Sequence, residues 1–182
     1  ISLLSLPIVG FQSWLTFSQA LSEYSQRPAF TVTAYQNIPS FFKHQFIADP
    51  VWNPSPIIHV PMLGTILSLC VIVALLGITF WKGREDKHPM MLYSAMILLS
   101  VMVSPASLDY HSAILLLPIL LLLADVQSMS RPQKLGLLIA IILLSVDYRY
   151  HDDVYSNTFL SLMAYPKLIG SLILWSVTVN RM

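Results

Sequence analysis

Residues 57–81 read IIHVPMLGTILSLCVIVALLGITFW and contain no acidic residue, lysine or arginine. An α-helix needs about 20 consecutive apolar residues to cross the roughly 30 Å hydrocarbon core of a bilayer. Because this stretch has that length and composition, it predicts a membrane-spanning helix with His59 near its start. We interpret the segments on either side of it as parts of the same membrane protein.

The whole chain is apolar: of its 182 residues 55% are hydrophobic and 10% are charged, and the mean hydropathy is +0.68. Soluble domains average about 25% charged residues, so the composition predicts an integral membrane protein. The net charge of +1, without a basic stripe to neutralise phosphates, argues against nucleic-acid binding. The single cysteine, Cys70, lies in an apolar run and supports neither a disulfide framework nor a cysteine metal site.

Four more helices are predicted on the C-terminal side, and with the first they make a membrane bundle over residues 57–182. The five expected helices are 57–81, 89–104, 111–125, 134–150 and 159–179. The predicted fold class is therefore all-α, a polytopic helical bundle. The second and third apolar runs are each shorter than a full span. They form either a re-entrant hairpin or, more simply, two spans extended by polar turns.

Residues 11–56 are predicted to be a structured extracytoplasmic loop that carries short interfacial helices. Large apolar side chains first recur at three- and four-residue spacing, with polar ones between them: Trp14, Phe17, Leu21 and Tyr24. This pattern is typical of an amphipathic helix lying in the membrane interface, or of a core helix in a soluble cap. A second short apolar face follows, with Pro39 near its first helical position: Ile38, Phe41, Phe42 and Phe46.

The chain begins at Ile1, and residues 1–10 resemble the end of a membrane helix punctuated by Pro7 and Gly10. No basic segment or small-residue cleavage site precedes that run, which argues against a signal peptide. We therefore expect the C-terminal part of a longer protein, with a truncated helix at its start.

Positive charge predicts the orientation of the bundle. Six of the ten Lys and Arg residues lie in the turns 82–88 and 125–134 and at the C-terminus, and turns of this kind face the cytoplasm. The loop at 11–56, the stretch 104–111 and the loop at 147–157 then face outside. We therefore expect a multi-pass plasma-membrane protein whose site lies on the outer side.

A polar stretch, SPASLDYH at residues 104–111, separates the second and third apolar runs. Its Ser-Pro pair ends a helix, because proline lacks a backbone donor and biases the preceding residue away from α geometry. Asp109 and His111 follow two residues apart at the tip of this hairpin. Ionisable groups at or near membrane depth are costly to place, which makes them functional candidates.

Several stretches, taken in order, resemble glycosyltransferase family 87. Residues 37–43, NIPSFFK, resemble the family's Asn-x-Ser…Arg segment, and residues 104–111 resemble its Ser-Pro-x-Ser-Trp-Asp/Glu-His-His element. The ILLLP run at 114–118 is similar to the Leu-Leu-Pro run that follows this element, and residues 165–175 are similar to the family's last helix. The family usually has Trp, His and Arg where this chain has Leu108, Tyr110 and Lys43.

The resemblance implies a class C membrane glycosyltransferase of a bacterial plasma membrane. Such an enzyme moves mannose or a related hexose, with inversion, from a polyprenyl-phosphate donor to an extracytoplasmic glycan or lipid acceptor. It also implies a catalytic Asp in a loop upstream of Ile1, so the isolated chain is expected to be inactive. No cofactor or metal is expected. The alternatives are a transporter or lipid carrier, although no internal repeat is found, and a non-catalytic membrane scaffold.

The predicted site for the donor phosphate and substrate uses polar residues of the outer side: Lys43, His111, Asp109, Asn37, Ser40 and His59. Lys43 and His111 are the candidates to stabilise charge that builds on the phosphate in the transition state. Asn37 and Ser40 are neutral donors. The structural alternatives are a lysine that reaches lipid headgroups at position 43 and a capping or packing residue at position 111. Asp109 either orients His111, binds acceptor hydroxyls or caps the next helix.

Three other residues or clusters have both a functional and a structural interpretation. Asp147 and His151 would share a helix face at four-residue spacing, which suggests a metal site, but a solvated loop between helices is the simpler interpretation. Trp52 either stacks on a sugar ring or anchors the loop at the interface, where tryptophan is enriched. His59 is a weaker site candidate, at the mouth of its helix after a proline-rich loop.

Overall fold

The computed structural model describes residues 10–25, 33–51, 53–84, 89–105, 109–145, 161 and 163–182. The α-helices are α2 (Phe11–Ser25), α3 (Ile38–Phe46), α4 (Pro61–Gly83), α5 (Pro89–Val103), α6 (Leu116–Ala124), α7 (Arg131–Ser145) and α8 (Pro166–Val179). Two 3₁₀ segments, η3 (Asp109–Leu115) and η4 (Val126–Ser128), flank α6. Among these residues the only β pairing is an isolated bridge between Asp49 and Asn53, so the all-α prediction is confirmed.

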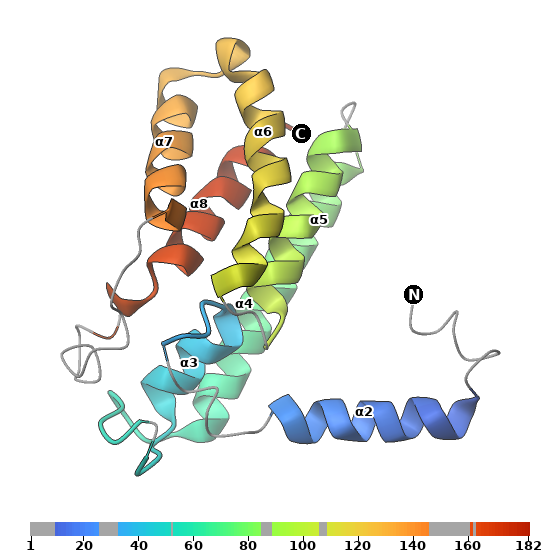
Figure 1. Cartoon of the computed structure of the whole chain (residues 1–182), viewed down its shortest axis with the longest axis vertical. Helices are drawn as coiled ribbons and strands as arrows, with labels where there is room; N and C mark the ends of the chain where they lie inside the picture. Colours follow the sequence, from blue (N-terminus) through green and yellow to red (C-terminus); the bar gives the residue numbers. More distant parts are fainter. Residues whose placement is uncertain are drawn as a thin grey trace.

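Helices α4 to α8 run back and forth between two ends of a bundle (Figure 1). At one end α4 and α6 finish, α5 and α7 begin, and Arg181 lies just after α8; we call it the Arg181 end. The opposite end, the α3 end, holds α3, the start of α4, the end of α5 and the start of α8. The turn after α4 and the turn before α7, which lead into or out of helices through basic residues, therefore gather at the Arg181 end, as the charge pattern predicts.

The core is built around α8, which packs against both α5 and α7. Leu98, Met102, Leu122 and Leu174, from α5, α6 and α8, are fully buried. Gly170 lets α8 approach α7 closely, because a Cβ there would lie 3.1 Å from the Ala140 carbonyl oxygen. α4 lies at the edge of this core.

Helix α4 begins at Pro61, four residues later than the predicted start at residue 57. Proline suits the first turn, where backbone N–H groups have no partner within the helix. The residues before it are held by α3: Ile58 N–H donates to the Gln45 carbonyl at 3.3 Å, and Val60 N–H to the Phe46 carbonyl at 3.0 Å. These bonds to the end of α3 replace the first turn of the predicted helix.

The other boundaries also shift at proline residues and caps. The last helix begins at Pro166 rather than at residue 159, because the residue before a proline is biased away from α geometry, and Tyr165 has φ −121° and ψ 48°. The predicted helix at 111–125 starts as the 3₁₀ segment η3, and α6 begins at Leu116. α7 begins at Arg131 rather than at residue 134. Its start is capped, because the Gln133 side chain reaches back and its Oε1 accepts from the Ser130 N–H at 3.0 Å.

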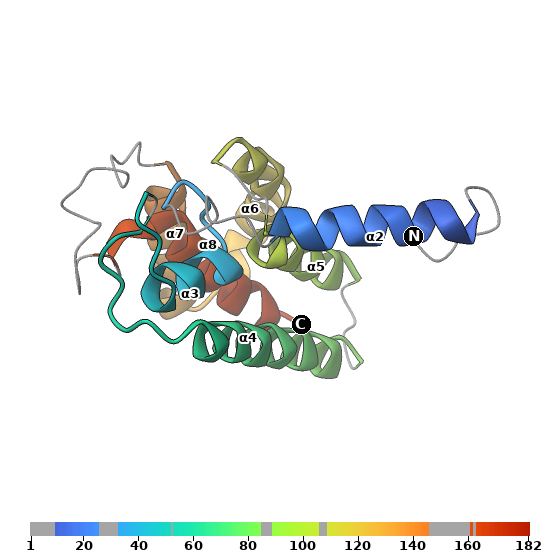
Figure 2. The same ribbon diagram turned by 90° about the horizontal axis from the view of Figure 1, so that it is seen from below.

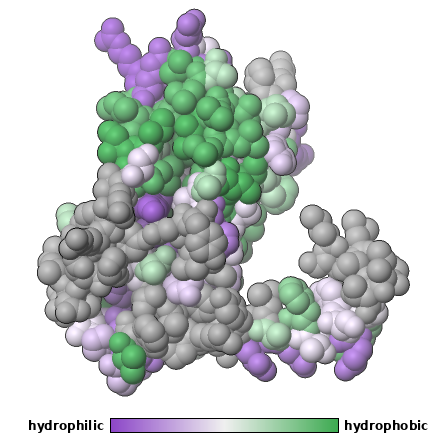
Figure 3. Space-filling view, in the orientation of Figure 1, coloured by the Kyte–Doolittle hydropathy of each residue, from purple (hydrophilic) through white to green (hydrophobic). Residues whose placement is uncertain are grey.

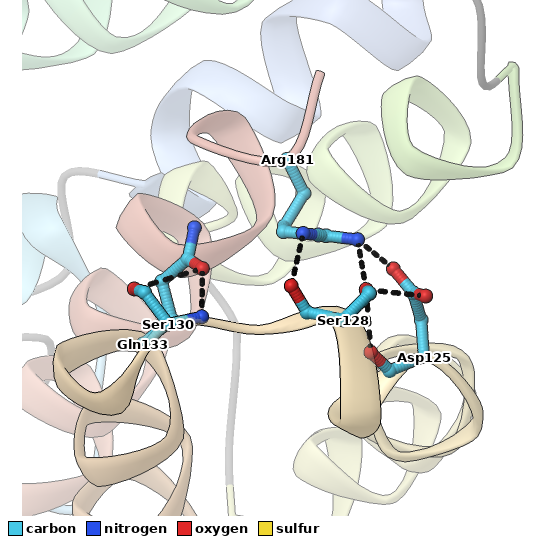
Figure 4. A network of polar contacts seen from close by, with 5 residues as sticks. All are labelled: Asp125, Ser128, Ser130, Gln133 and Arg181. Carbon is cyan, nitrogen blue, oxygen red and sulfur yellow. Dashed lines mark hydrogen bonds and ion pairs between the residues drawn. The ribbon is translucent and has the colours of Figure 1, made fainter.

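The Arg181 end is joined by a partly exposed polar network (Figure 4). The Arg181 guanidinium pairs with the Asp125 carboxylate and donates to Ser128 Oγ at 2.5 Å. The Ser128 hydroxyl in turn donates to Asp125 Oδ1 at 2.6 Å. These contacts tie the segment after α8 to the turn between α6 and α7.

Helix α4 is the one helix among the described residues that is long and apolar enough to cross a membrane. The shorter apolar helices are Pro89–Val103, His111–Ala124 and Pro166–Val179. Only 22% of the apolar window of α4 is buried inside the protein. Large apolar side chains are also exposed on α6 and α7, among them Leu116, Leu120, Leu135 and Leu138, and apolar surface dominates the upper part of Figure 3.

Candidate functional site at the α3 end

The candidate site is built on α3, whose start is fixed by an asparagine cap. Asn37 has extended backbone geometry, with φ −138° and ψ 167°, and its Oδ1 accepts from the Ser40 N–H at 2.8 Å. Pro39 follows in the first turn, where no N–H is needed. Asn37 Nδ2 donates to the Pro105 carbonyl at 3.3 Å. One amide thus joins the two stretches that carried the main sequence motifs, residues 37–43 and 104–111.

A buried tyrosine and histidine hold α3 against the start of α8. The Tyr165 hydroxyl donates to the Ser40 carbonyl at 3.3 Å and lies 3.0 Å from His44 Nδ1. A hydroxyl has one proton to give, so the Nδ1–H tautomer of His44 completes this chain of hydrogen bonds. Phe41 packs edge-to-face on the Tyr165 ring, with centroids 5.1 Å apart. The contact is therefore both apolar and hydrogen-bonded.

Burial keeps both of these side chains neutral. Tyr165 is fully buried and His44 is 4% exposed. Burial lowers the pKa of His44 to about 4 and raises the pKa of Tyr165, because the charged forms would lose their hydration. Neither group therefore carries a charge near neutral pH, and the pair acts as a neutral hydrogen-bonded link.

Further buried amides and hydroxyls complete what we call the polar layer: Gln36, Asn37, Ser40, His44, Gln45, Asn53, Ser161 and Tyr165. Gln36 Nε2 donates to the Ala164 carbonyl at 2.8 Å, and its Oε1 accepts from the Lys167 N–H at 3.1 Å. The Ser161 hydroxyl donates to Gln45 Oε1 at 2.9 Å, and Asn53 Nδ2 to the His44 carbonyl at 2.7 Å. The layer clamps α3 to the start of α8 and to its own following loop.

An apolar cavity of about 370 Å³ lies beside the polar layer, between α3, α4 and α8. It is lined by Ile38, Phe41, Phe42, Val71, Tyr165, Leu168, Ile169 and Leu172. The cavity is many times larger than the roughly 30 Å³ that one water occupies. Its lining suits a hydrocarbon chain.

The predicted site residues differ in accessibility. Asn37 and Ser40 are 0% and 1% exposed, and the Asn37 amide is occupied on both sides. In this conformation both are buried, and Asn37 positions the start of α3. Lys43 is partly buried, and burial lowers the pKa of its amine. It lies about 100° around the helix from its neighbour Phe42, away from the face that lines the cavity.

The remaining predicted residues lie outside the polar layer. His111 is exposed on η3, and Asp109 begins η3; the Asp109 side chain lies outside what the structure describes. His59 is exposed, and its Nδ1 accepts from the Ala48 N–H at 2.9 Å, which gives it a role in closing the loop after α3. Trp52 and the Asp147–His151 cluster also fall outside the described residues. In the part that is described, no group of three His, Cys, Asp or Glu side chains is arranged to hold a metal.

Sequence reasoning missed Gln36, His44, Gln45 and Tyr165. A signal was available for His44, because Asn37, Ser40 and His44 recur at three- and four-residue spacing and so share a helix face. The partner across that face, Tyr165, is 121 residues away from His44, and no local pattern indicates such a pairing.

Comparison of the chain with models of protein families, with curated proteins and with solved structures found no match in any of the three. The resemblance to glycosyltransferase family 87 therefore stays a prediction drawn from the motifs.

Proposed function

We propose that this chain is the membrane part of a glycosyltransferase that moves a hexose, mannose in the family's pattern, from a polyprenyl-phosphate donor to an extracytoplasmic glycan or lipid. Transfer would invert the anomeric carbon. The observation that carries the proposal is the arrangement of the α3 end. There a buried polar layer joins the two motif stretches beside an apolar cavity.

The membrane placement is supported by surface and charge. α4 has an apolar window of mean hydropathy 2.5 that is 22% buried, so most of its apolar surface needs lipid or another protein to cover it. Lys82, Arg84, Arg131, Lys134 and Arg181 all belong to the Arg181 end, which would face the cytoplasm. In this multi-pass arrangement the α3 end faces outside, in a bacterial plasma membrane.

The donor would bind with its two chemical parts in different places. The cavity between α3, α4 and α8 offers apolar walls for part of the polyprenyl chain. Lys43 and His111 are the predicted side chains that remain at least partly exposed on the two motif stretches, and they are our candidates for contacting the phosphate. Preorganised donors at that position stabilise negative charge as it develops on the leaving group.

The reaction would be a single displacement. An acceptor hydroxyl forms the new C–O bond at the anomeric carbon while the bond to the phosphate oxygen breaks, and the polyprenyl phosphate leaves with the electron pair. A base must take the hydroxyl proton. The polar layer contains no carboxylate, so the base would be a group outside that layer. Asn37, His44 and Tyr165 would position α3 without touching the reacting atoms.

The test uses the full-length protein in liposomes with radiolabelled mannosyl-phosphoryl-polyprenol. His111→Ala and Lys43→Ala are each expected to lower transfer by about 10²-fold, the usual effect of losing one charge-stabilising donor. Lys82→Ala, at the Arg181 end, is the matched control and should keep full activity. Full transfer by both variants would remove these residues from the site. Lipid counterflow without any transfer would favour the lipid-carrier alternative.

A further inference from the structure

Helix α2 stands apart from the bundle and lies across its long axis. Figure 1 shows α2 lying across the direction of the bundle and level with the α3 end. Figure 2, turned by 90°, shows the same helix projecting sideways from the bundle. Its 15 residues make it about 22 Å long. A helix that projects sideways from a membrane-spanning helix, level with one of its ends, runs along the membrane surface.

The sequence of α2 separates apolar and polar side chains around the helix. Successive residues are turned by about 100° around the helix. One side, the apolar side, carries Phe11, Trp14 and Leu15, with Phe17 at its margin. The other side carries polar residues: Gln12, Thr16, Gln19 and Glu23. Phe11 is 64% exposed and Phe17 is 60% exposed. Ser18 lies within the apolar side, and its hydroxyl donates to the Leu15 carbonyl at 2.8 Å.

We propose that α2 binds the outer leaflet of the bilayer and lies at the boundary between headgroups and acyl chains. Phe11, Trp14, Leu15 and Phe17 would enter the bilayer, and the glutamine side would face water. This inference rests on the proposed function in one respect, the placement of α4 across the membrane. The partner is a lipid surface because α2 lies level with the start of α4, whose apolar surface is mostly exposed.

The charge of α2 specifies the kind of lipid surface. Residues 11–25 contain one acidic residue, Glu23, and no lysine or arginine. Most interfacial helices add electrostatic attraction to anionic lipids through basic residues, and α2 has none. Its binding comes from apolar burial alone. A zwitterionic bilayer is therefore sufficient, and neither anionic lipid nor salt changes the binding.

The experiment places nitroxide labels on the full chain in a Cys70→Ser background, reconstituted in phosphatidylcholine liposomes. Phe17→Cys and Gln19→Cys probe opposite sides of α2, and Phe11→Cys and Gln12→Cys are a second pair. Val73→Cys, on an exposed position of α4, is the reference for lipid contact, and Ser55→Cys is the reference for water. Collisions with oxygen report lipid exposure, and collisions with a nickel chelate report water exposure.

We expect the labels at 11 and 17 to collide mainly with oxygen, like the label at 73, and those at 12 and 19 mainly with the nickel chelate. The pattern should not change when anionic lipid or 0.5 M salt is added, conditions that would alter binding driven by charge. Equal nickel accessibility on both sides would overturn the inference, and so would protection of 11 and 17 from both reagents, which indicates a protein partner. If the label at 73 is not in lipid, the membrane placement of the proposed function fails as well. If it is in lipid while 11 and 17 are in water, the inference about α2 fails alone.

Discussion

The two ends of the bundle satisfy their polar groups in opposite ways. The α3 end uses neutral side chains that are nearly all buried, such as the Tyr165–His44 pair. The Arg181 end uses an ion pair whose side chains, Arg181 and Asp125, are 22% and 39% exposed. A buried group that loses its partner cannot turn to water, whereas an exposed group can. Stability should therefore depend on single atoms at the α3 end and only weakly on whole charges at the Arg181 end.

The largest effect should come from adding a proton to His44. Its pKa is about 4 in the folded chain, below the ordinary value of 6.5, so the unfolded chain binds more protons between these values. The free energy of unfolding therefore rises as the pH increases from about 4 to about 6.5. Above that range the contribution of neutral His44 to stability is fully present. The pKa difference corresponds to about 3 kcal/mol. Urea titrations in detergent micelles at a series of pH values would measure it.

His44→Gln is the control for this pH dependence, because other histidines and carboxylates titrate in the same range. The difference between the parent protein and His44→Gln should shrink as the pH falls from 7 to 4. A difference that is constant over this range would show that His44 is not held neutral by burial, and the contrast between the two ends would then lose its main physical basis.

The next effect should come from removing one oxygen atom at the α3 end. Tyr165→Phe keeps the ring contact with Phe41 but removes the hydroxyl that lies against His44 Nδ1 and donates to the Ser40 carbonyl. An unsatisfied buried group costs about 1–3 kcal/mol. The free energy of unfolding should fall by that amount in detergent. Tyr93→Phe is the matched control, since Tyr93 is 56% exposed on α5, and it should leave stability unchanged. Equal effects of the two variants would contradict the argument.

The fold of the α3 end was partly predictable from the sequence, for local reasons. Asn37 followed by Pro39 and a run of phenylalanines predicts a capped helix, and α3 has that form. Its attachment to α8 was not predictable, because Gln36 reaches Ala164 and His44 reaches Tyr165 across more than 100 residues. Asn37 and Ser40 were predicted as neutral donors to the donor phosphate, and that role stays a prediction. The structure uses them to position α3.

Helix boundaries show the same division between local and distant causes. Proline and capping residues explain where α7 and α8 start, and both signals are present in the sequence. The late start of α4 at Pro61 depends on hydrogen bonds from residues 58 and 60 to the end of α3, which only the tertiary fold supplies. At the Arg181 end, charge predicted that the turns gather together. The pairing of Arg181 with Asp125, 56 residues apart, was not evident from either segment.

The smallest effect should come from the ion pair at the Arg181 end, even though this change removes a full charge. Arg181→Gln abolishes the pair with Asp125, but both positions remain in contact with water, and Ser128 still donates to the Asp125 carboxylate. Exposed pairs of this kind contribute about 0.2–1 kcal/mol, and salt screens them. The difference in free energy of unfolding between the parent protein and Arg181→Gln should shrink at high salt. The difference between the parent protein and Tyr165→Phe should be the same at all salt concentrations. A loss in Arg181→Gln that exceeds the loss in Tyr165→Phe would reverse the comparison, because it would make the exposed charges, and not the neutral buried layer, the main polar support of the bundle.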